Sequence, residues 1–420
     1  MIRALYSVCL WLAQALVRRK LRRRAMNEPR YGHAIEQRFG HYDVPPFPQD
    51  PAKPFIWVHA VSLGETRAAA VLVAGLRKKY PGMRLLLTHG TATGWEQGTA
   101  LLQEGDVQAW QPWDTPGAVQ RFLAQFQPRI GLLMETEVWP NMVAECKRAG
   151  VPLCLVNARM SEKSMRSALR LRWLSRPAYA GLHTVLAQTE DDARRLRGLG
   201  ATVHVVTGNL KFDATPDAAL LARGRTWRAS STKPVLMFTS SREGEEQMLI
   251  DVLKSKPLPA VQWLIVPRHP QRFDAVAALF EAAGFSVSRR STWVDAPEKA
   301  DIWLGDSLGE MALYYGLADA ALLGGSFAPL GGQNLIEAAA CGCPVLMGPH
   351  TFNFAQAADM AQAEGAALRC VDLSDALRQS AALLADPAAL ARARNAALAW
   401  SVAHQGATRR TLEALGAGGS

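Results

Sequence analysis

The sequence predicts an α/β protein built from two Rossmann-like, doubly wound domains. From about residue 55 onward, short apolar runs alternate with helical patterns, as in a parallel sheet covered by helices on both faces. A polar segment without strand character, residues 211–233, interrupts this alternation, which then starts again. The chain has 420 residues, more than one ordinary hydrophobic core accommodates, so we expect two domains.

Each half of the chain contributes its own series of strands. Ligands of such sheets bind beyond the carboxyl ends of the strands, so we expect a site in a cleft that the two domains face. The predicted strands are 55–60, 84–88, 130–134, 152–156, 184–187 and 203–206 in the first half, and 235–239, 263–267, 302–304, 321–323 and 345–347 in the second. The predicted helices include 65–80, 140–148, 190–199 and a helical tail over 374–415.

The N-terminal segment differs from the rest of the chain. Residues 4–17 are apolar except for Ser7 and Gln14, and between Arg18 and Arg24 six of seven residues are basic. As a helix, residues 4–17 span roughly 21 Å, which is short against a hydrocarbon core of about 30 Å. The charges follow the apolar run instead of preceding it, so the segment is unlike a cleaved signal peptide. By the positive-inside rule, the basic run and the rest of the chain after it are expected in the cytoplasm.

We therefore predict a membrane anchor or interfacial helix within residues 1–30, with an amphipathic helix docked on the protein itself as the alternative. The first domain is expected over 31–215. The second domain, including the helical tail, is expected over 230–420.

Charge and cysteine content restrict the function. The net charge is +10, but no nucleic-acid-binding motif accompanies it, so an anionic membrane surface or anionic substrate explains it as well. The six cysteines form no C-x-x-C pair and the nine histidines are scattered. This pattern favours reduced thiols in the cytosol and no structural metal site.

One glycine-rich stretch, residues 324–348, reads as strand, turn, helix, turn and strand. The turn that opens its helix offers backbone N–H groups to an anionic ligand. Glu337, in the first turn of that helix, is placed to accept two hydroxyl hydrogens from one sugar. These features predict a nucleotide-sugar site, although an ordinary βαβ turn explains the glycines alone.

Polar residues collect at the predicted strand ends of the first half. Glu65 follows the first strand, where it is either a general base or a carboxylate that complements the helix dipole. Glu135 and Glu137 follow another strand, and one of them is expected to be an orienting or electrostatic group. The alternative is that both belong to an acidic cluster at the N-terminus of the next helix. Lys211 follows the last strand and suits an anion or developing negative charge, although a lone loop lysine is more often only solvated.

The second half has comparable positions. Arg268 lies between two prolines at a strand end, which makes it a plausible phosphate ligand. The turn at residues 305–310 opens a helix whose N–H groups could hold a phosphate or a base edge.

Seven motifs, in this order along the chain, match one family: HAVSLGE, METEVWPN, NARMS, GNLKFD, VPRHPQRF, GDSLGE and GGQNLIEAAACGCPVLMGPHTFNF. Together they resemble the 3-deoxy-D-manno-octulosonic acid (Kdo) transferases that act on lipid A precursors. Each motif alone is weak, but seven in register over nearly the full chain are very specific. The resemblance implies a GT-B glycosyltransferase that uses CMP-Kdo without a metal or other cofactor.

The resemblance also implies residue roles. Glu65 is the proton acceptor, and Glu135 and Lys211 stabilise the transition state. The implied CMP-binding residues are Pro267, Arg268, Leu308, Gly309, Glu310, Asn334, Leu335, Ile336 and Glu337. Two departures concern the donor side: Ser-Arg-Glu-Gly-Glu stands where some relatives have Thr-His-Glu-Gly-Glu, and Gln333 replaces a common histidine.

The implied reaction is an inverting transfer of Kdo to a phosphorylated lipid A precursor, lipid IVA, in lipopolysaccharide core biosynthesis. The implied location is the cytoplasmic face of the cell inner membrane, and no nucleic acid is expected as a partner. One alternative is a GT-B transferase or epimerase that uses a UDP-sugar. Another is a non-enzymatic, membrane-tethered scaffold or nucleic-acid binder, which the net charge alone supports.

Overall fold

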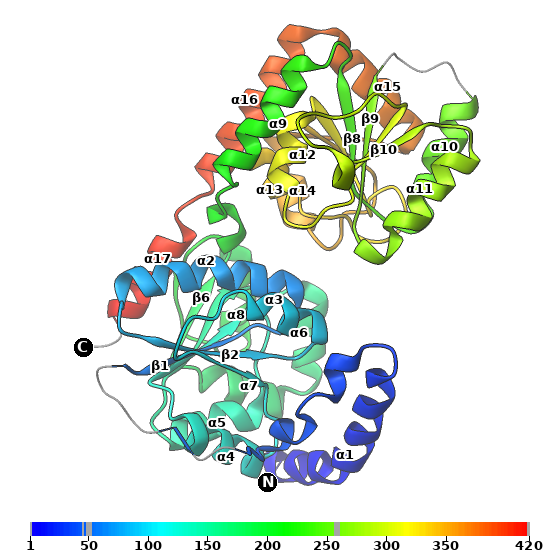
Figure 1. Cartoon of the computed structure of the whole chain (residues 1–420). Coiled ribbons are helices and arrows are strands. Elements are labelled where there is room, and N and C mark those ends of the chain that lie inside the picture. Colours follow the sequence, from blue (N-terminus) through cyan, green and yellow to red (C-terminus); the bar gives the residue numbers. More distant parts are fainter. Residues whose placement is uncertain (1, 44–45, 48–52, 256–260, 418–420) are drawn as a thin grey trace. The chain divides into compact units, whose positions relative to one another are not determined.

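The computed structural model describes residues 2–43, 46–47, 53–255 and 261–417 (Figure 1). The chain divides into two compact units. The first comprises residues 1–213 together with 405–420, and the second comprises residues 214–404.

The first unit contains a seven-stranded parallel sheet with the order β3-β2-β1-β4-β5-β6-β7. The order reverses between β1 and β4, and ligands of such sheets bind beyond the carboxyl ends of the strands at this point. The strands are β1 Phe55–His59, β2 Arg84–His89, β3 Val107–Trp110, β4 Ile130–Met134, β5 Leu153–Ala158, β6 Thr184–Ala187 and β7 Val203–Val206.

Helices cover both faces of this sheet, because alternate residues of each strand point to opposite sides. In β1, Trp57 packs into one hydrophobic core, and Ile56 and Val58 pack into the other. The helices are α1 Ile2–Ala25, α2 Leu63–Lys79, α3 Ala92–Thr99, α4 Pro116–Phe126, α5 Pro140–Arg148, α6 Glu162–Arg170, α7 Arg172–Ala180, α8 Glu190–Gly198 and α17 Ala407–Ala417, with 3-10 turns η1 Pro29–Gly32, η2 Ile35–Phe39 and η3 Leu210–Asp213.

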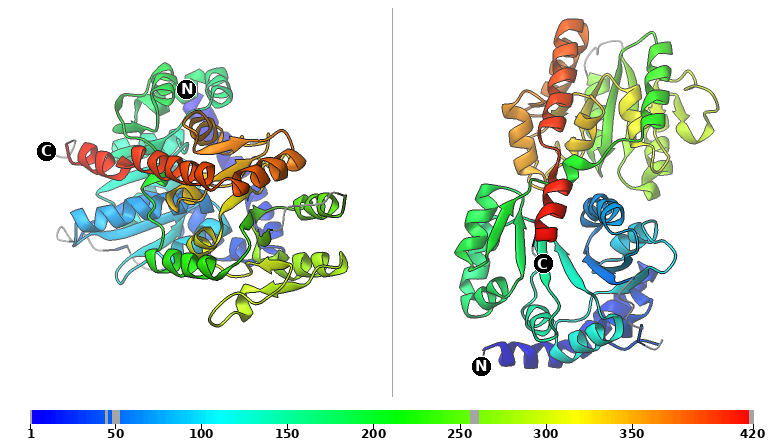
Figure 2. Two further views of the ribbon diagram at one scale, coloured as in Figure 1. Left: turned by 90° about the horizontal axis from the view of Figure 1, so that it is seen from above. Right: turned by 90° about the vertical axis from the view of Figure 1, so that its left-hand side faces the viewer.

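The last helix, α17, packs on the first unit alongside α2 (Figures 1 and 2). The Asp213 carboxylate accepts hydrogen bonds from the backbone N–H groups of Gly406, at 2.6 Å, and Thr408. The helices approach so closely that a Cβ atom at Gly75 would lie 2.8 Å from the Thr408 side chain. The sequence predicts that residues 230–420 form the second domain, but residues 405–420 cluster with the first unit because of these contacts.

The second unit repeats the architecture with a parallel sheet of order β10-β11-β9-β8-β12-β13-β14, whose order reverses between β8 and β12. Its strands are β8 Val235–Ser241, β9 Gln262–Pro267, β10 Val287–Arg289, β11 Ile302–Leu304, β12 Ala320–Leu323, β13 Val345–Met347 and β14 Ala367–Arg369. Its helices are α9 Ala218–Ser230, α10 Glu245–Ser255, α11 Phe273–Ala282, α12 Met311–Leu317, α13 Leu335–Ala340, α14 Ala355–Ala363, α15 Leu373–Ala385 and α16 Pro387–Ala403, with 3-10 turns η4 Pro270–Arg272 and η5 Arg290–Thr292.

The predicted α/β class with two doubly wound sheets is confirmed. Three strands were not expected: β3, β10 and β14, each at an edge of its sheet. As predicted, the described segment 211–233 contains no strand, and it includes helix α9, which packs against α12. Gly224 permits this contact, because a Cβ atom there would lie 2.1 Å from the carbonyl oxygen of Leu313.

Helix α1 extends beyond the predicted residues 4–17 and includes the basic run. One face is docked on the first unit: Tyr6 Oη donates to Asp114 Oδ2 at 3.0 Å, and Trp113 Nε1 donates to the Leu10 carbonyl at 3.2 Å. Within the described residues, no helix is both long enough and apolar enough to cross a membrane. The docking on the protein that we considered as an alternative is therefore observed.

Candidate functional site

Glu65 lies in the first turn of α2, directly beyond the carboxyl end of β1. Ser62 caps the helix and accepts a hydrogen bond from the Glu65 N–H at 3.4 Å. The Glu65 carboxylate turns back and accepts the Val61 N–H through Oε2 at 2.6 Å. This reciprocal arrangement resembles a capping box, and it fixes the carboxylate at the reversal point of the sheet.

The environment of Glu65 makes it a better base than an ordinary carboxylate. The pKa of Glu65 is raised to about 7, mainly by burial and also by the negative charges of Glu135 and Glu137. The Val61 hydrogen bond and the Lys211 charge act in the opposite direction. A general base is most effective when its pKa lies near the working pH. The geometry therefore suits Glu65 to take a proton from a hydroxyl group near neutrality.

Glu135 and Lys211 form an ion pair next to this position. Lys211 Nζ lies 2.9 Å from Glu135 Oε1, and Arg159 Nε lies 3.4 Å from Glu135 Oε2. Glu135 has φ +56°, a left-handed conformation that non-glycine residues rarely adopt. Such strain persists where the surrounding structure holds it, often at functional sites.

A second strained residue supports Lys211. Asn157, in β5, has φ +52°, and its Oδ1 accepts the Leu210 N–H at 3.0 Å. This bond fixes the start of η3, the turn that carries Lys211. Glu65, Glu135 and Lys211, which the sequence predicts as one group, are thus brought together by the first unit alone.

Glu137 does not join this group through a charge pair. Its Oε2 accepts the Trp139 indole N–H at 2.7 Å, and burial raises its pKa above the ordinary value. Glu135 rather than Glu137 is therefore the carboxylate of this motif that pairs with Lys211.

In the second unit, Arg268 follows β9, whose last residue is Pro267. Arg268 Nε donates to Gln333 Oε1 at 3.1 Å, and its backbone N–H donates to the Ser241 carbonyl at 3.0 Å. Gln333, one of the two departures from the family pattern, therefore orients the Arg268 side chain. This contact joins two of the donor-side segments that the sequence singles out.

The segment 334–337 starts helix α13, which has only six residues. The Asn334 side chain caps it by accepting the Ile336 N–H at 3.2 Å. The side chains of Leu335 and Ile336 are buried, so a ligand can meet only their backbone groups. Because the helix is short and one N–H is occupied, its dipole contributes less than the sequence suggests.

The turn at 308–310 is mostly exposed. Leu308 extends into solvent with an exposed fraction of 74%, and Gly309 has φ +80°, a conformation that glycine adopts without strain. The Glu310 carboxylate already accepts hydrogen bonds from Arg290, at 2.7 Å, and from Ser307. Glu310 is therefore held in place by its neighbours, and the backbone of Leu308 and Gly309 is the accessible part of this turn.

Sequence reasoning missed the role of Glu245. This fully buried carboxylate accepts the Gly325 N–H at 2.7 Å and the Phe327 N–H at 3.2 Å, and so holds the glycine-rich loop after β12. Ser240, at the neighbouring end of β8, has φ +51°, and Gly324 lies so close that a Cβ atom would be 2.2 Å from the Ser240 carbonyl oxygen. The only hint in the sequence was the acidic run Glu-Gly-Glu-Glu at residues 243–246. The backbone groups that bind Glu245 lie about 80 residues further along the chain, so the run alone does not reveal them.

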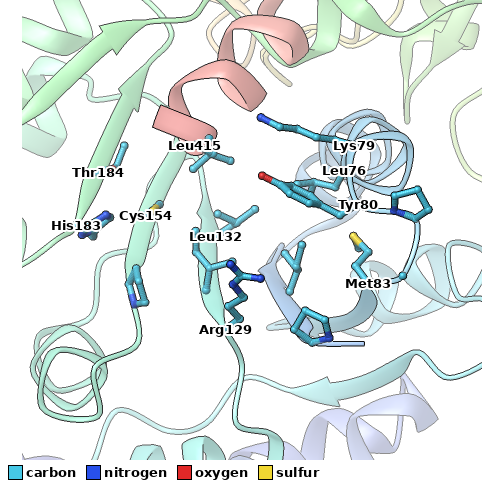
Figure 3. Close-up of a pocket in the computed structure, with 17 residues that line it drawn as sticks. Leu76, Lys79, Tyr80, Met83, Arg129, Leu132, Cys154, His183, Thr184 and Leu415 are labelled. Carbon is cyan, nitrogen blue, oxygen red and sulfur yellow. The ribbon is translucent and has the colours of Figure 1, made fainter. Parts of the chain in front are cut away.

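A pocket of about 680 Å³ in the first unit lies elsewhere (Figure 3). Its lining includes Ile56, Ile130 and Thr184 at the amino ends of β1, β4 and β6, together with Lys79 and Leu415. Glu65 follows the opposite, carboxyl end of β1. This pocket therefore belongs to the other edge of the sheet. Among the described residues, no group of three or more His, Cys, Asp or Glu side chains is arranged to hold a metal ion.

Comparisons with known proteins identify the family. Residues 33–214 match the family model described as 3-Deoxy-D-manno-octulosonic-acid transferase (kdotransferase). The 3-deoxy-D-manno-octulosonic acid transferase of Bordetella pertussis is 51% identical over 373 residues, which cover 86% of this chain and 86% of the relative. The enzyme of that name from Haemophilus influenzae is 31% identical over 425 residues, covering 99% of this chain and 98% of the relative.

Solved structures match at the level of the fold. A UDP-GlcNAc 2-epimerase from Neisseria meningitidis bound to UDP-GlcNAc has a TM-score of 0.56 and 14% identity, covering 86% of this chain and 99% of that chain. A glycosyltransferase from Rickettsia africae has a TM-score of 0.55 and 14% identity, covering 86% of this chain and 97% of that chain. With its two parallel sheets and with relatives that match most of its length, the chain belongs to the 3-deoxy-D-manno-octulosonic acid transferase family and is a Kdo-transferring glycosyltransferase of the GT-B fold.

Proposed function

We propose that this enzyme transfers Kdo from CMP-Kdo to a lipid A precursor, lipid IVA, with inversion at the anomeric carbon and Glu65 as the proton acceptor. The observation that carries the proposal is the half-buried Glu65 carboxylate, whose pKa burial raises to about 7, beside the Glu135–Lys211 pair. A carboxylate of this kind can deprotonate a primary hydroxyl as the hydroxyl becomes a nucleophile.

The proposed step is one displacement. Glu65 takes the proton of the acceptor hydroxyl, and the acceptor oxygen forms a bond to the anomeric carbon of Kdo. The bond between that carbon and the phosphate oxygen breaks, and CMP leaves with the electron pair. Lys211, held by Glu135 at 2.9 Å, offers a positive charge to the negative charge that develops in the transition state.

The proposed donor site lies in the second unit. Arg268, oriented by Gln333, is suited to the single phosphate of CMP. Glu337 is suited to the ribose hydroxyls. The proposed CMP-binding set is completed by Pro267, Leu308, Gly309, Glu310, Asn334, Leu335 and Ile336. Since a nucleoside monophosphate carries no diphosphate to clamp, we propose that catalysis needs no metal ion.

The test follows CMP release from the purified protein. We expect release from CMP-Kdo only when a lipid A precursor is present, at an undiminished rate in excess EDTA, and inhibition by CMP rather than by UDP. Loss of activity in EDTA that Mg²⁺ restores would contradict the metal-independent mechanism. Stronger inhibition by UDP would favour the alternative of a UDP-sugar enzyme.

We also propose that α1 binds the enzyme to the cytoplasmic face of the inner membrane by lying in the lipid interface. The outward face of α1 exposes large apolar side chains, with exposed fractions of 65–69% at Leu5, Trp11, Leu12 and Leu16. Leu5, Leu12 and Leu16 are spaced so that they lie along one side of the helix. Arg19 and Arg23 follow on the same side, because they are three and seven residues after Leu16. An apolar stripe followed by exposed cations suits an anionic lipid surface.

Vesicle co-sedimentation tests this location. We expect the wild type to bind vesicles that contain phosphatidylglycerol more tightly than vesicles of phosphatidylcholine alone. Leu5→Glu/Leu12→Glu should weaken binding to the anionic vesicles at least tenfold, because two apolar side chains no longer enter the lipid. The matched control is Val294→Glu/Val371→Glu, which alters two side chains that are 78% and 77% exposed in the second unit. Equal loss in both double variants would contradict a role for α1.

A further inference from the structure

A small pocket of about 230 Å³ lies within the first unit, beyond the carboxyl ends of its strands. The residues that line it include Arg38, Val61, Trp113, Glu137 and Trp139. The Val61 N–H is the group that holds the Glu65 carboxylate at 2.6 Å. The pocket therefore borders the proposed proton acceptor, within the same unit.

Arg38 is a cation without a carboxylate partner in this pocket. One guanidinium nitrogen donates to the Gly90 carbonyl at 3.2 Å, and the guanidinium carbon lies 3.8 Å from the centre of the Trp110 ring. Its Nε is buried and has no hydrogen-bond partner. Across the described residues, no Asp or Glu forms an ion pair with Arg38 or is among the charges that shift its pKa. Burial lowers the pKa of Arg38 to about 10, so the group is still charged at neutral pH.

Such an uncompensated charge is costly inside a protein unless an anion joins it. His59, which is buried nearby, does not add a second positive charge, because burial lowers its pKa to about 3 and keeps it neutral.

The two carboxylates of the pocket are occupied elsewhere. Asp114 accepts the backbone N–H groups of Asn141, at 3.1 Å, and Met142, at 2.7 Å, as well as the Tyr6 hydroxyl. Burial raises the pKa of Asp114 to about 6. Glu137 accepts the Trp139 indole N–H at 2.7 Å. Neither carboxylate forms an ion pair with Arg38, so the guanidinium keeps hydrogen-bonding capacity for an anion.

The two indoles suit a sugar. The Trp113 N–H donates to the Leu10 carbonyl and the Trp139 N–H donates to Glu137, so both rings use their polar atom within the protein. Their remaining surface is apolar, and the flat carbon faces of a sugar ring can pack against it. A pocket with aromatic walls and one unpaired guanidinium fits a sugar that carries a phosphate.

The pocket is also connected to the helix that we propose lies in the membrane. The loop at residues 113–114 forms part of the pocket wall and binds α1 through Leu10 and Tyr6. The opposite face of α1 carries the exposed apolar side chains. A sugar headgroup whose lipid chains remain in the bilayer would therefore need to reach across only one helix and one loop.

We propose that this pocket binds the phosphorylated sugar headgroup of the acceptor, with Arg38 as the ligand of its phosphate. The proposal rests on the proposed function, because it takes the lipid A precursor as the acceptor. On this proposal, specificity for the acceptor depends on the first unit. The residue responsible, Arg38, lies in the turn η2, which is outside the seven family motifs.

The test uses Arg38→Gln and Arg38→Lys in the full-length enzyme, with an acceptor that carries its phosphates and with the same acceptor after their removal. For Arg38→Gln we expect KM for the phosphorylated acceptor to rise at least tenfold, KM for the dephosphorylated acceptor to change less than twofold, and KM for CMP-Kdo to stay constant. Arg38→Lys should recover part of the loss, since it keeps the charge without the planar fork.

Arg194→Gln, at a 69% exposed side chain of the first unit, is the matched control and should behave as wild type. Thermal unfolding of each variant checks the fold. An equal rise of KM for both acceptors would assign Arg38 a structural role and overturn the proposal. Failure of the wild type to release CMP with either acceptor would overturn the proposed function instead.

Discussion

Replacing Glu65 by glutamine is expected to reduce kcat by about 10³-fold and to leave CMP binding unchanged. The amide has nearly the same shape and can still accept the Val61 N–H, but it cannot take a proton from the acceptor hydroxyl. General bases contribute typically 10²–10⁴-fold to a rate, so the effect is large. Single-turnover kinetics give the rate, and titration calorimetry with CMP gives the binding constant. The matched control is Glu190→Gln, whose side chain is 77% exposed on α8.

The same residue sets the expected pH dependence. Because burial raises the pKa of Glu65 to about 7, the active, ionised form should be lost as the pH falls through that value. The plot of kcat/KM against pH should therefore show an acid limb near pH 7 for the wild type, and this limb should disappear in Glu65→Gln. An unchanged limb in the variant, or turnover near the wild-type value, would show that another group is the base.

Replacing Lys211 by methionine is expected to have the second largest effect. The change removes the cation that lies 2.9 Å from Glu135, so kcat should fall about 10²-fold through lost transition-state stabilisation. Lys211 also lowers the pKa of Glu65, while the Glu135 charge raises it. Without Lys211 the pKa of Glu65 should rise, and the acid limb of the kcat/KM profile should move to higher pH.

The direction of that shift separates an electrostatic role from a merely structural one. Lys211→Arg keeps the charge and should return the acid limb toward its original position, with partial recovery of kcat. Arg159 remains 3.4 Å from Glu135, so we expect Lys211→Met to fold and to lose stability by about 1–3 kcal/mol. A shift of the limb to lower pH would contradict the proposed coupling of the three groups.

Most strands were predictable because each is a short run of apolar residues that pack within the sheet. Strands β4, β6 and β7 begin and end where the sequence predicts. The edge strands β10 and β14 were not predictable, because each mixes polar with apolar side chains. Strands β11 and β13 are equally short but wholly apolar, and they begin and end as predicted. The position of α17 could not be predicted either, since it depends on contacts between Asp213 and residues almost 200 positions later.

In the candidate site, residues that directly follow strands were predictable, because parallel strands bring their carboxyl ends to one edge. Glu65, Glu135 and Lys211 are of this kind. Arg38 is not, because it lies on a short turn before the first strand and is placed by the side chain of Trp110. Glu245 shows a similar limit, because its partners are backbone groups of a distant loop, which leave no pattern of their own in the sequence.

The return of α17 to the first unit has a consequence for synthesis of the chain. Helix α17 covers the surface of α2 around Gly75. During synthesis, this surface stays exposed until residues 407–417 have left the ribosome. The second unit, residues 214–404, is translated in between, which takes roughly 10–40 s at about 5–20 residues per second. The second unit can therefore complete its fold first, in the reverse of the usual amino-terminal-first order. Loss of the last helix would then damage the amino-terminal half of the enzyme, which carries the proposed base.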